Sequence, residues 1–373
     1  MNGNGLTRQQ EKELARRLLE EIRQLSEQVG RKVRLMEVCG THTVEIFRAG
    51  LRQLLPEAVE LVSGPGCPVC VTPDSYMDKA VAYALDPDII VTTFGDMLKV
   101  PGSSSSLAEA QATGGDVRIV YSPLDSLKTA AENPAKRIVF LAVGFETTAP
   151  TAAATLLAAR QQGLKNFYLL SAEKLVPPAM RHLLADEEMQ IDGFLLPGHV
   201  AVVTGSEEFR FLAEEYHLPA VVAGFKPLEL LRAVYRLMRQ LAAGEAKLEN
   251  EYGSVVTAQG NVAAQKLVKE LYGCVAAEWR GLGRIADSGL QLREEWAEYD
   301  IERLRPLKLQ ETKQRRTACR CGEVLQGKVT PLQCPLFGGA CVPEHAIGPC
   351  MVSVEGVCAA WYKYGGGKFS YDG

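Results

Sequence analysis

Cysteines are the residues of this chain whose types and spacing are best suited to chemistry. Three lie in glycine-rich sequence near the N-terminus and are called here the N-terminal thiols: Cys39, Cys67 and Cys70. Six fall within residues 319–358 and are called the C-terminal thiols: Cys319, Cys321, Cys334, Cys341, Cys350 and Cys358. Only Cys274 lies outside both groups. Thiolates bind metals and exchange disulfides, so we expect metal or redox chemistry at two separate places.

The N-terminal thiols predict an open metal site. Cys67-Pro-Val-Cys70 has the spacing of two thiols that share a metal or form a redox disulfide, although one such motif alone is a weak signal. Cys39 stands where a helix is expected to begin, and a helix N-terminus acidifies a thiol and so favours metal binding near neutral pH. Three thiolates suit an iron that carries exogenous ligands. A structural zinc would need a fourth ligand, and His42 is the nearest candidate; otherwise His42 is a hydrogen-bonded structural residue.

The C-terminal thiols are two more than a four-iron cluster uses, because such a cluster takes four thiolates. The economical interpretation places Cys319, Cys334, Cys341 and Cys358 on a 4Fe-4S cluster. Cys321 and Cys350 are then a neighbouring pair that cycles between disulfide and dithiol. One or two structural zinc sites remain the alternative on spacing alone.

Composition excludes some partners and favours a location. The chain has 41 Lys and Arg against 45 Asp and Glu, a net charge of −4, which gives no reason to expect nucleic acid or an anionic membrane as a partner. The N-terminal sequence has no signal-peptide pattern, and the longest mildly apolar stretch, 147–159, is far short of the roughly 20 residues that a membrane helix needs. We therefore expect a cytoplasmic protein, with reduced thiols.

The elements that must position these thiols alternate between strand and helix. Residues 7–29, 227–243 and 261–272 have the apolar spacing of amphipathic helices. Short runs of β-branched residues, separated by helix-like stretches, predict an α/β architecture with mostly parallel sheets. The runs are 33–38, 59–62, 88–93, 117–121, 137–143, 167–170, 193–196 and 220–223.

Most of these strands run into loops rich in Gly, Pro, Thr or Cys, and the N-terminal thiols are in two of them. In open α/β sheets the ligand crevice lies at the carboxyl ends of the strands, so the loops are expected to gather on one sheet edge or to face each other across two sheets. We predict a first α/β domain at 1–120, a second at 121–225, and a helical linker with a C-terminal cluster domain at 226–373. The irregular tail from about residue 315 cannot build an apolar core, and a metal cluster is the obvious candidate to hold it.

The motifs resemble those of the HypD family of hydrogenase maturation proteins, in order, from about residue 30 to 364. They are Cys-Gly-Thr-His-Thr (39–43), Gly-Pro-Gly-Cys-Pro-Val-Cys (64–70), Gly-Phe-Glu-Thr-Thr (144–148), Pro-Gly-His-Val (197–200), Trp-Arg-Gly-Leu-Gly (279–283) and Cys-Met-Val-Ser-Val-Glu-Gly-Val-Cys (350–358). The resemblance implies two Rossmann-like α/β domains and an irregular C-terminal iron–sulfur domain. That region is similar to the one in ferredoxin:thioredoxin reductase, where a disulfide lies beside the cluster.

The resemblance also implies a function. The family provides the scaffold on which the iron of nickel–iron hydrogenases receives two cyanides and one carbon monoxide. It acts with a HypC-type small chaperone and a HypE-type cyanide donor. By motif, Cys39 and Cys70 are the thiolates nearest the iron, and Cys67 is a further metal ligand and the redox partner of Cys70.

Four more residues fall in family motifs and are candidates for proton handling or for supporting the iron site: His42, Asp96, His199 and Glu355. The ordinary alternatives are a helix cap for Asp96, a loop contact for His199 and a solvated side chain for Glu355. The leading hypothesis is a scaffold rather than a turnover enzyme, with electrons passing from the cluster through Cys321 and Cys350 to Cys67 and Cys70. A cluster-dependent thiol–disulfide reductase and a zinc-stapled binding module are the alternatives.

Overall fold

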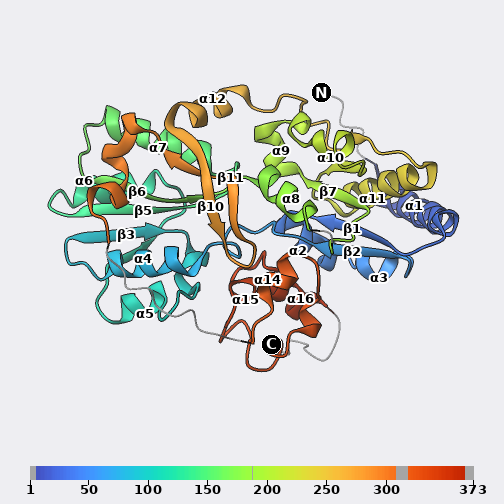
Figure 1. Ribbon diagram of the computed structural model, residues 1–373, viewed down its shortest axis with the longest axis horizontal. Coiled ribbons are helices and arrows are strands. Elements are labelled where there is room, and N and C mark those ends of the chain that lie inside the picture. The colour runs from blue at the N-terminus through green and yellow to red at the C-terminus, as the bar shows by residue number, and fades with distance from the viewer. Residues whose placement is uncertain (1–5, 187, 308–317, 366–373) are drawn as a thin grey trace.

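The computed structural model describes residues 6–186, 188–307 and 318–365, which form two α/β lobes around two parallel sheets. Figure 1 shows the lobes side by side, with the C-terminal region below the line where they meet. Each strand pair within both sheets is parallel. The predicted α/β class with Rossmann-like sheets is therefore confirmed. In the part of the chain that is described, no helix combines the length and apolar character needed to cross a membrane.

All eight predicted strands form, with ends that differ by at most three residues from the prediction. The first sheet has the order β2 (Val59–Ser63), β1 (Val33–Glu37), β7 (Gly193–Pro197), β8 (Ala220–Ala223) and β9 (Leu248–Asn250). The second has the order β4 (Val117–Ile119), β3 (Ile89–Thr93), β5 (Arg137–Gly144) and β6 (Phe167–Glu173).

Two separate segments of the chain form the first sheet. The chain makes β1 and β2, crosses to the second lobe for β3 to β6, and returns for β7 to β9. Neither sheet therefore corresponds to one of the continuous segments 1–120 and 121–225. Hydrogen bonds between β1 and β7 join residues more than 150 positions apart, so the return brings loops from both ends of this stretch to one sheet edge.

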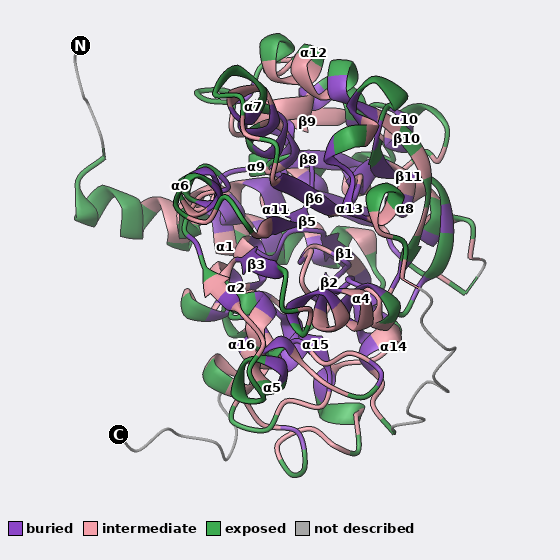
Figure 2. Cartoon of the chain, turned by 90° about the vertical axis from the view of Figure 1, so that its left-hand side faces the viewer, coloured by how far each residue is buried: buried purple, intermediate pink, exposed green. Residues whose placement is uncertain are grey.

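Helices cover both faces of each sheet, and the apolar side chains between them form the cores. On the first sheet, one face packs against α1 (Arg8–Val29), α3 (Leu51–Leu54) and α11 (Pro227–Ala243), and the other against α8 (Val176–Leu184), α9 (Gly198–Thr204) and α10 (Phe211–Glu214). On the second, one face packs against α6 (Asp125–Glu132), α7 (Ala149–Gln161) and α12 (Val262–Leu271), and the other against α4 (Asp74–Ala84), α5 (Leu107–Ala112) and α13 (Ile301–Leu304). Figure 2 shows the buried strands enclosed by partly exposed helices.

An antiparallel hairpin that the sequence analysis did not predict lies between the lobes (Figure 1). Its strands are β10 (Tyr272–Trp279) and β11 (Gly283–Leu292). One end of the hairpin joins the core of the second lobe through Tyr272 and Leu290. The other end joins the core of the first lobe through Trp279 and Ile285. The hairpin is therefore packed into both lobes.

The C-terminal region has only short helices: α14 (Cys321–Leu325), η4 (Pro331–Gln333), α15 (Pro349–Val352) and α16 (Val357–Tyr364). Residues 315–317, where the irregular tail was expected to begin, lie outside the described residues. Cys321, Leu325 and Cys350 are part of the apolar core of the first lobe. Trp361 of α16 also packs edge-on against Phe47, with ring centroids 5.1 Å apart. Packing against the first lobe thus contributes directly to holding this region, which we had expected a metal cluster to do.

Candidate metal and thiol site

The loops that carry the N-terminal thiols touch each other at the carboxyl ends of β1 and β2. Cys39 is the N-cap of α2 (Gly40–Arg48), and the Gly40 N–H donates to the Gly66 carbonyl at 3.0 Å. A Cβ on Gly66 would lie 2.1 Å from the Cys39 nitrogen, so this close approach requires glycine. The parallel pairing of β1 with β2 therefore brings Cys39 beside the Cys67 loop, as strand ends in one sheet should.

Cys39 is buried beside a buried carboxyl group. Its N–H donates to Glu37 Oε2 at 3.0 Å, and the Thr43 hydroxyl donates to Glu37 Oε1 at 2.5 Å. Burial raises the pKa of Glu37 to about 7. Burial also raises the pKa of Cys39 to about 12, although the N–H groups of His42 and Thr41 act in the opposite direction. The expectation of an acidified Cys39 is thus wrong for the metal-free thiol, because burial outweighs the helix N-terminus.

The two thiols of the Cys-x-x-Cys motif differ in acidity. Both are buried, and the Cys70 N–H donates to the Cys67 carbonyl at 3.1 Å, which closes the turn. Hydrogen bonds from Cys350 and Cys67, together with the nearby Arg280 charge, lower the pKa of Cys70. The hydrogen bond to Cys70 and burial raise the pKa of Cys67. The pKa of Cys70 therefore lies below that of Cys67.

Arg280, at the turn of the hairpin, is held against the Cys67–Cys70 loop. Its backbone N–H donates to the Val71 carbonyl at 2.9 Å, and its Nε donates to the Thr72 carbonyl at 2.6 Å. The guanidinium also pairs with Asp74 at 2.6 Å. These contacts fix a positive charge near Cys70, and a fixed positive charge favours a thiolate.

Cys350 connects the two groups of thiols. Its Sγ is 2.8 Å from the Sγ of Cys321, so a movement of less than ~1 Å would bring the two to the disulfide bond length of about 2.0 Å. Hydrogen bonds also join the Cys350 side chain to Cys358 and Cys70. A continuous series of thiol contacts therefore runs from Cys358 to Cys67.

The remaining C-terminal thiols face one another across short loops. Burial raises the pKa of Cys319 to about 12, with contributions from Cys321, Cys334 and Cys358. The nearby Cys341 likewise contributes to the raised pKa of Cys358. The Ile347 N–H donates to Cys341 Sγ at 3.4 Å, and a Cβ on Gly348 would lie 2.8 Å from Cys319 Sγ.

This donor set fits a four-iron cluster in its chemistry. Such a cluster takes four thiolate ligands, and here four thiols come from three loops and one helix. Hydrogen bonds to the sulfur atoms support a cluster, and one amide N–H is already directed at a sulfur. Among the described residues, no three His, Cys, Asp or Glu side chains converge as ligands of one metal ion do. A four-iron cluster is wider than a single ion, and its thiolates stand correspondingly farther apart.

The two candidate histidines both contact the ring of Phe225, which follows β8. His42 is fully buried, its Nε2 is 3.0 Å from the Gly224 carbonyl, and its Nδ1 has no partner among the described residues. Burial lowers the pKa of His42 to about 4, so the ring is neutral. His199, on α9, is exposed and stacks on Phe225 with ring centroids 3.8 Å apart.

Asp96 is connected to Cys67 through Ser353, and Glu355 is connected to the Cys39 loop through Thr41. The Cys67 thiol is in hydrogen-bond contact with the Ser353 hydroxyl, which donates to Asp96 Oδ2 at 3.1 Å. Asp96 comes from η1 (Gly95–Lys99), at the carboxyl end of β3 in the other lobe. The Thr41 hydroxyl donates to Glu355 Oε1 at 2.7 Å. The C-terminal region thus brings loops of both sheets together around Cys39 and Cys67.

Comparison with known proteins identifies the family. The family model described as "HypD: Hydrogenase formation hypA family" matches residues 13–365. The chain belongs to the HypD family. It is 48% identical over 355 residues to the hydrogenase maturation factor HypD of Escherichia coli (strain K12), with 94% of each chain covered. It is 42% identical over 363 residues to HypD of Rhodobacter capsulatus, covering 95% of this chain and 96% of the relative.

A third relative carries another name. The chain is 46% identical over 345 residues to the hydrogenase expression/formation protein HupD of Azotobacter chroococcum mcd 1, with 90% of each chain covered. All three matches extend over nearly the whole chain, and the family model spans both the N-terminal and the C-terminal thiols.

Sequence reasoning missed three residues that lie near the thiols in this HypD-family chain: Glu37, Arg280 and Ser353. Glu37 was part of the expected strand 33–38, where it stands between the apolar residues Met36 and Val38, and a carboxylate in that position was a signal of a buried and hydrogen-bonded group. Arg280 and Ser353 were inside quoted motifs but were given no role. Their roles depend on contacts with residues at least 200 positions away, which no local pattern contains.

Proposed function

We propose that this chain acts in hydrogenase maturation, the process in the names of its relatives, as a redox-active scaffold for the iron of nickel–iron hydrogenases. The iron, with two cyanides and one carbon monoxide, is its substrate. Cys39, Cys67 and Cys70 bind it. The observation that carries this proposal is the continuous series of thiol contacts from Cys358 through Cys350 to Cys70.

The four cysteines Cys67, Cys70, Cys321 and Cys350 exchange one disulfide bond between two pairs of thiols. The Cys350 thiolate attacks Cys70 in a Cys67–Cys70 disulfide, and the Cys67 thiolate leaves. Cys321 then attacks Cys350, which releases Cys70 and leaves a Cys321–Cys350 disulfide. Two electrons have then moved to the Cys67–Cys70 pair, which can bind iron as thiolates.

A 4Fe-4S cluster held by Cys319, Cys334, Cys341 and Cys358 would supply single electrons from an external low-potential donor. Two electrons and two protons restore the Cys321 and Cys350 thiols. Ser353, in contact with Cys67, and Asp96, which accepts from the Ser353 hydroxyl, are placed to take part in moving the proton of Cys67. His42, Glu355 and His199 shape the surroundings of Cys39. We further propose that a HypC-type chaperone and a HypE-type cyanide donor act on the same site, in the cytoplasm.

The test is infrared spectroscopy of the protein purified without oxygen together with its small chaperone. We expect metal-cyanide and metal-carbonyl bands in the wild type. Cys39→Ala should lose them while keeping the visible absorption of the C-terminal cluster. Cys274→Ala, whose exposed thiol is outside both groups, is the matched control and should keep both signals. Cyanide bands in Cys39→Ala would disprove the assignment of Cys39.

The second candidate, a cluster-dependent reductase of a partner's disulfide, uses the same thiol contacts. It predicts turnover of a protein disulfide with an electron donor, and no bound cyanide. Cys67 and Cys70 are both buried, which leaves a partner's disulfide no direct approach to them and favours the scaffold.

A further inference from the structure

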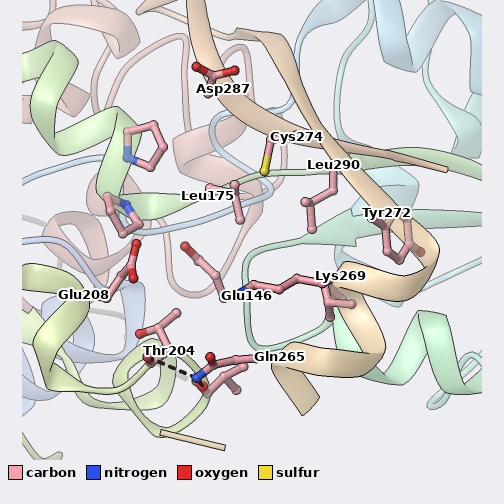
Figure 3. Close-up of a pocket in the computed structure, with 15 residues that line it drawn as sticks. Glu146, Leu175, Thr204, Glu208, Gln265, Lys269, Tyr272, Cys274, Asp287 and Leu290 are labelled. Carbon is pink, nitrogen blue, oxygen red and sulfur yellow. Dashed lines mark hydrogen bonds between the residues drawn. The ribbon is translucent and has the colours of Figure 1, made fainter. Parts of the chain in front are cut away.

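A cavity of about 350 Å³, in a different part of the molecule, has no role in the chemistry above. It lies between α8, α9, α12 and the hairpin, and most of its lining is apolar, with Leu175, Pro177, Val268 and Leu290 among its walls. Figure 3 shows two carboxyl groups, those of Glu146 and Glu208, on one side of it, with Leu175 and Cys274 nearby. A cavity of this size and character is typical of sites for small organic ligands.

Glu146 has an unsatisfied oxygen in this cavity. The side chain is only 7% exposed. Its Oε1 accepts a hydrogen bond from the Val176 N–H at 2.8 Å, whereas its Oε2 is buried and has no partner among the described residues. Burial raises the pKa of Glu146 to about 8. A buried carboxyl oxygen without a partner is costly, so a bound group that contacts it would be stabilising.

Glu208 supplies a second carboxyl to the same space. It comes from η2 (Ser206–Phe209), is exposed to solvent, and its charge contributes to the raised pKa of Glu146. Asp287 adds a third acidic side chain to the lining, and Lys269 is the one basic side chain there. The lining therefore favours a cation over an anion.

The loop that carries Glu146 also packs into the core around the thiols through an aromatic pair. Phe145, the residue before Glu146, stacks on Trp279 with ring centroids 5.9 Å apart. Both rings belong to the apolar core that includes Cys67 and Cys70. The loop after β5 thus contributes one residue to the core around the thiols and the next to the cavity.

We propose that this cavity is a binding site for a small organic cation, an amine with a short apolar body, whose ammonium group lies between Glu146 and Glu208. The nitrogen donates to the unpartnered Glu146 Oε2, and its positive charge favours release to solvent of the proton that burial otherwise keeps on Glu146. In the complex both side chains are then carboxylates that balance the ammonium charge. The carbon body covers the apolar walls. A bare metal ion would use the carboxyls but not those walls, and an organic anion would be repelled.

Calorimetric titration of the full-length protein with three matched probes tests the proposal. The probes are phenethylamine, the neutral 2-phenylethanol and the anionic phenylacetate. We expect phenethylamine to bind at least tenfold more tightly than either of the others, which is about 1.4 kcal/mol. Glu146→Gln and Glu208→Gln should each weaken phenethylamine binding on the order of tenfold, because each removes a charge that faces the ammonium group.

Glu207→Gln is the matched control, since Glu207 is an exposed neighbour of Glu208 that pairs with Arg210 outside the cavity. It should leave binding unchanged. If Glu146→Gln fails to fold, Glu208→Gln still decides the question, because Glu208 is exposed and its replacement should leave the fold intact. Equal binding of the amine and the alcohol, or no binding of the amine to the wild type, would overturn the proposal and leave a water-filled cavity. The outcome is independent of iron–cyanide binding and so separates this site from the proposed function.

Discussion

Gly66 shows how tightly single residues constrain the N-terminal thiols. Any side chain there would collide with the backbone of Val38 and Cys39, because a Cβ would lie 2.1 Å from the Cys39 nitrogen. We expect Gly66→Ala to destabilise the fold by about 1–3 kcal/mol or more, as overpacking does, and to separate the Cys39 loop from the Cys67 loop. Urea denaturation measures the first effect, and iron–cyanide infrared bands the second.

Gly339→Ala is the control for this substitution. A Cβ at position 339 meets nothing within 4 Å, so stability should change little. Equal stability of the two variants would contradict the close approach of the two loops.

The contacts of Cys350 lead to a second prediction at this scale. Cys350 contacts both Cys70 and Cys321, so it is the thiol that attacks, and Cys321 is the one that resolves. In Cys321→Ser, mild oxidation should therefore trap a Cys350–Cys70 disulfide, detectable by mass spectrometry of non-reduced peptides. Cys350→Ser should give no such link. A Cys319–Cys70 link in its place would show that the order of thiols is different.

The grouping of the thiols was visible in the sequence, whereas their acidity was not. Spacing separated the two groups, and the most economical division of the C-terminal thiols paired Cys321 with Cys350, whose sulfur atoms lie 2.8 Å apart. The acidity of Cys39 was predicted wrongly, because a sequence shows that a helix begins at residue 40 but not that the thiol beside it is buried.

Among the elements, the hairpin tip adds a further junction between the C-terminal region and the lobes near the thiols. Gly281 at the tip lies against Gly322 of α14, where a Cβ on Gly322 would be 2.9 Å from the Gly281 Cα. Gln326 Nε2 also donates to the Gly281 carbonyl at 2.7 Å.

We expect Gly322→Ala to loosen this junction, at a cost of about 1–3 kcal/mol for overpacking. Limited proteolysis should then cut the C-terminal region faster than in the wild type. Gly273→Ala, in the same hairpin but with open space around it, should leave the digestion rate unchanged. Identical digestion of all three proteins would show that the tip contact does not hold the region.

Strand positions could be predicted from sequence, whereas the partners of strands could not. A run such as 33–37 is recognised from its own residues, but its pairing with 193–195 depends on a hydrogen-bonded register across the fold. The hairpin was missed for a related reason. Its strands alternate only weakly between buried and exposed residues, and Gly281 and Gly283, both with positive φ, were noticed as part of a family motif rather than as a turn.

At the scale of the whole molecule, the thiol site belongs to no single part of the chain. Cys67 comes from the first lobe, Asp96 from the second, and Ser353, which contacts both, from the C-terminal region. Stability of the whole fold therefore determines whether the site exists, and that stability depends on pH through buried carboxyl groups.

Glu173, at the end of β6, gives the sharpest test of this dependence. It is buried, and burial raises its pKa from 4.5 to about 8. Between these values the folded protein keeps a proton that the unfolded chain loses, so stability falls as pH rises, by up to about 1.4 kcal/mol per pH unit for this group. Glu173→Gln removes this contribution.

We expect the stability of the Glu173→Gln variant, measured by urea denaturation at pH 5.5, 6.5 and 7.5, to fall less steeply with pH than that of the wild type. The exposed Glu270→Gln should follow the wild type. Parallel curves for Glu173→Gln and the wild type would mean that Glu173 ionises in the folded protein as readily as in the unfolded chain.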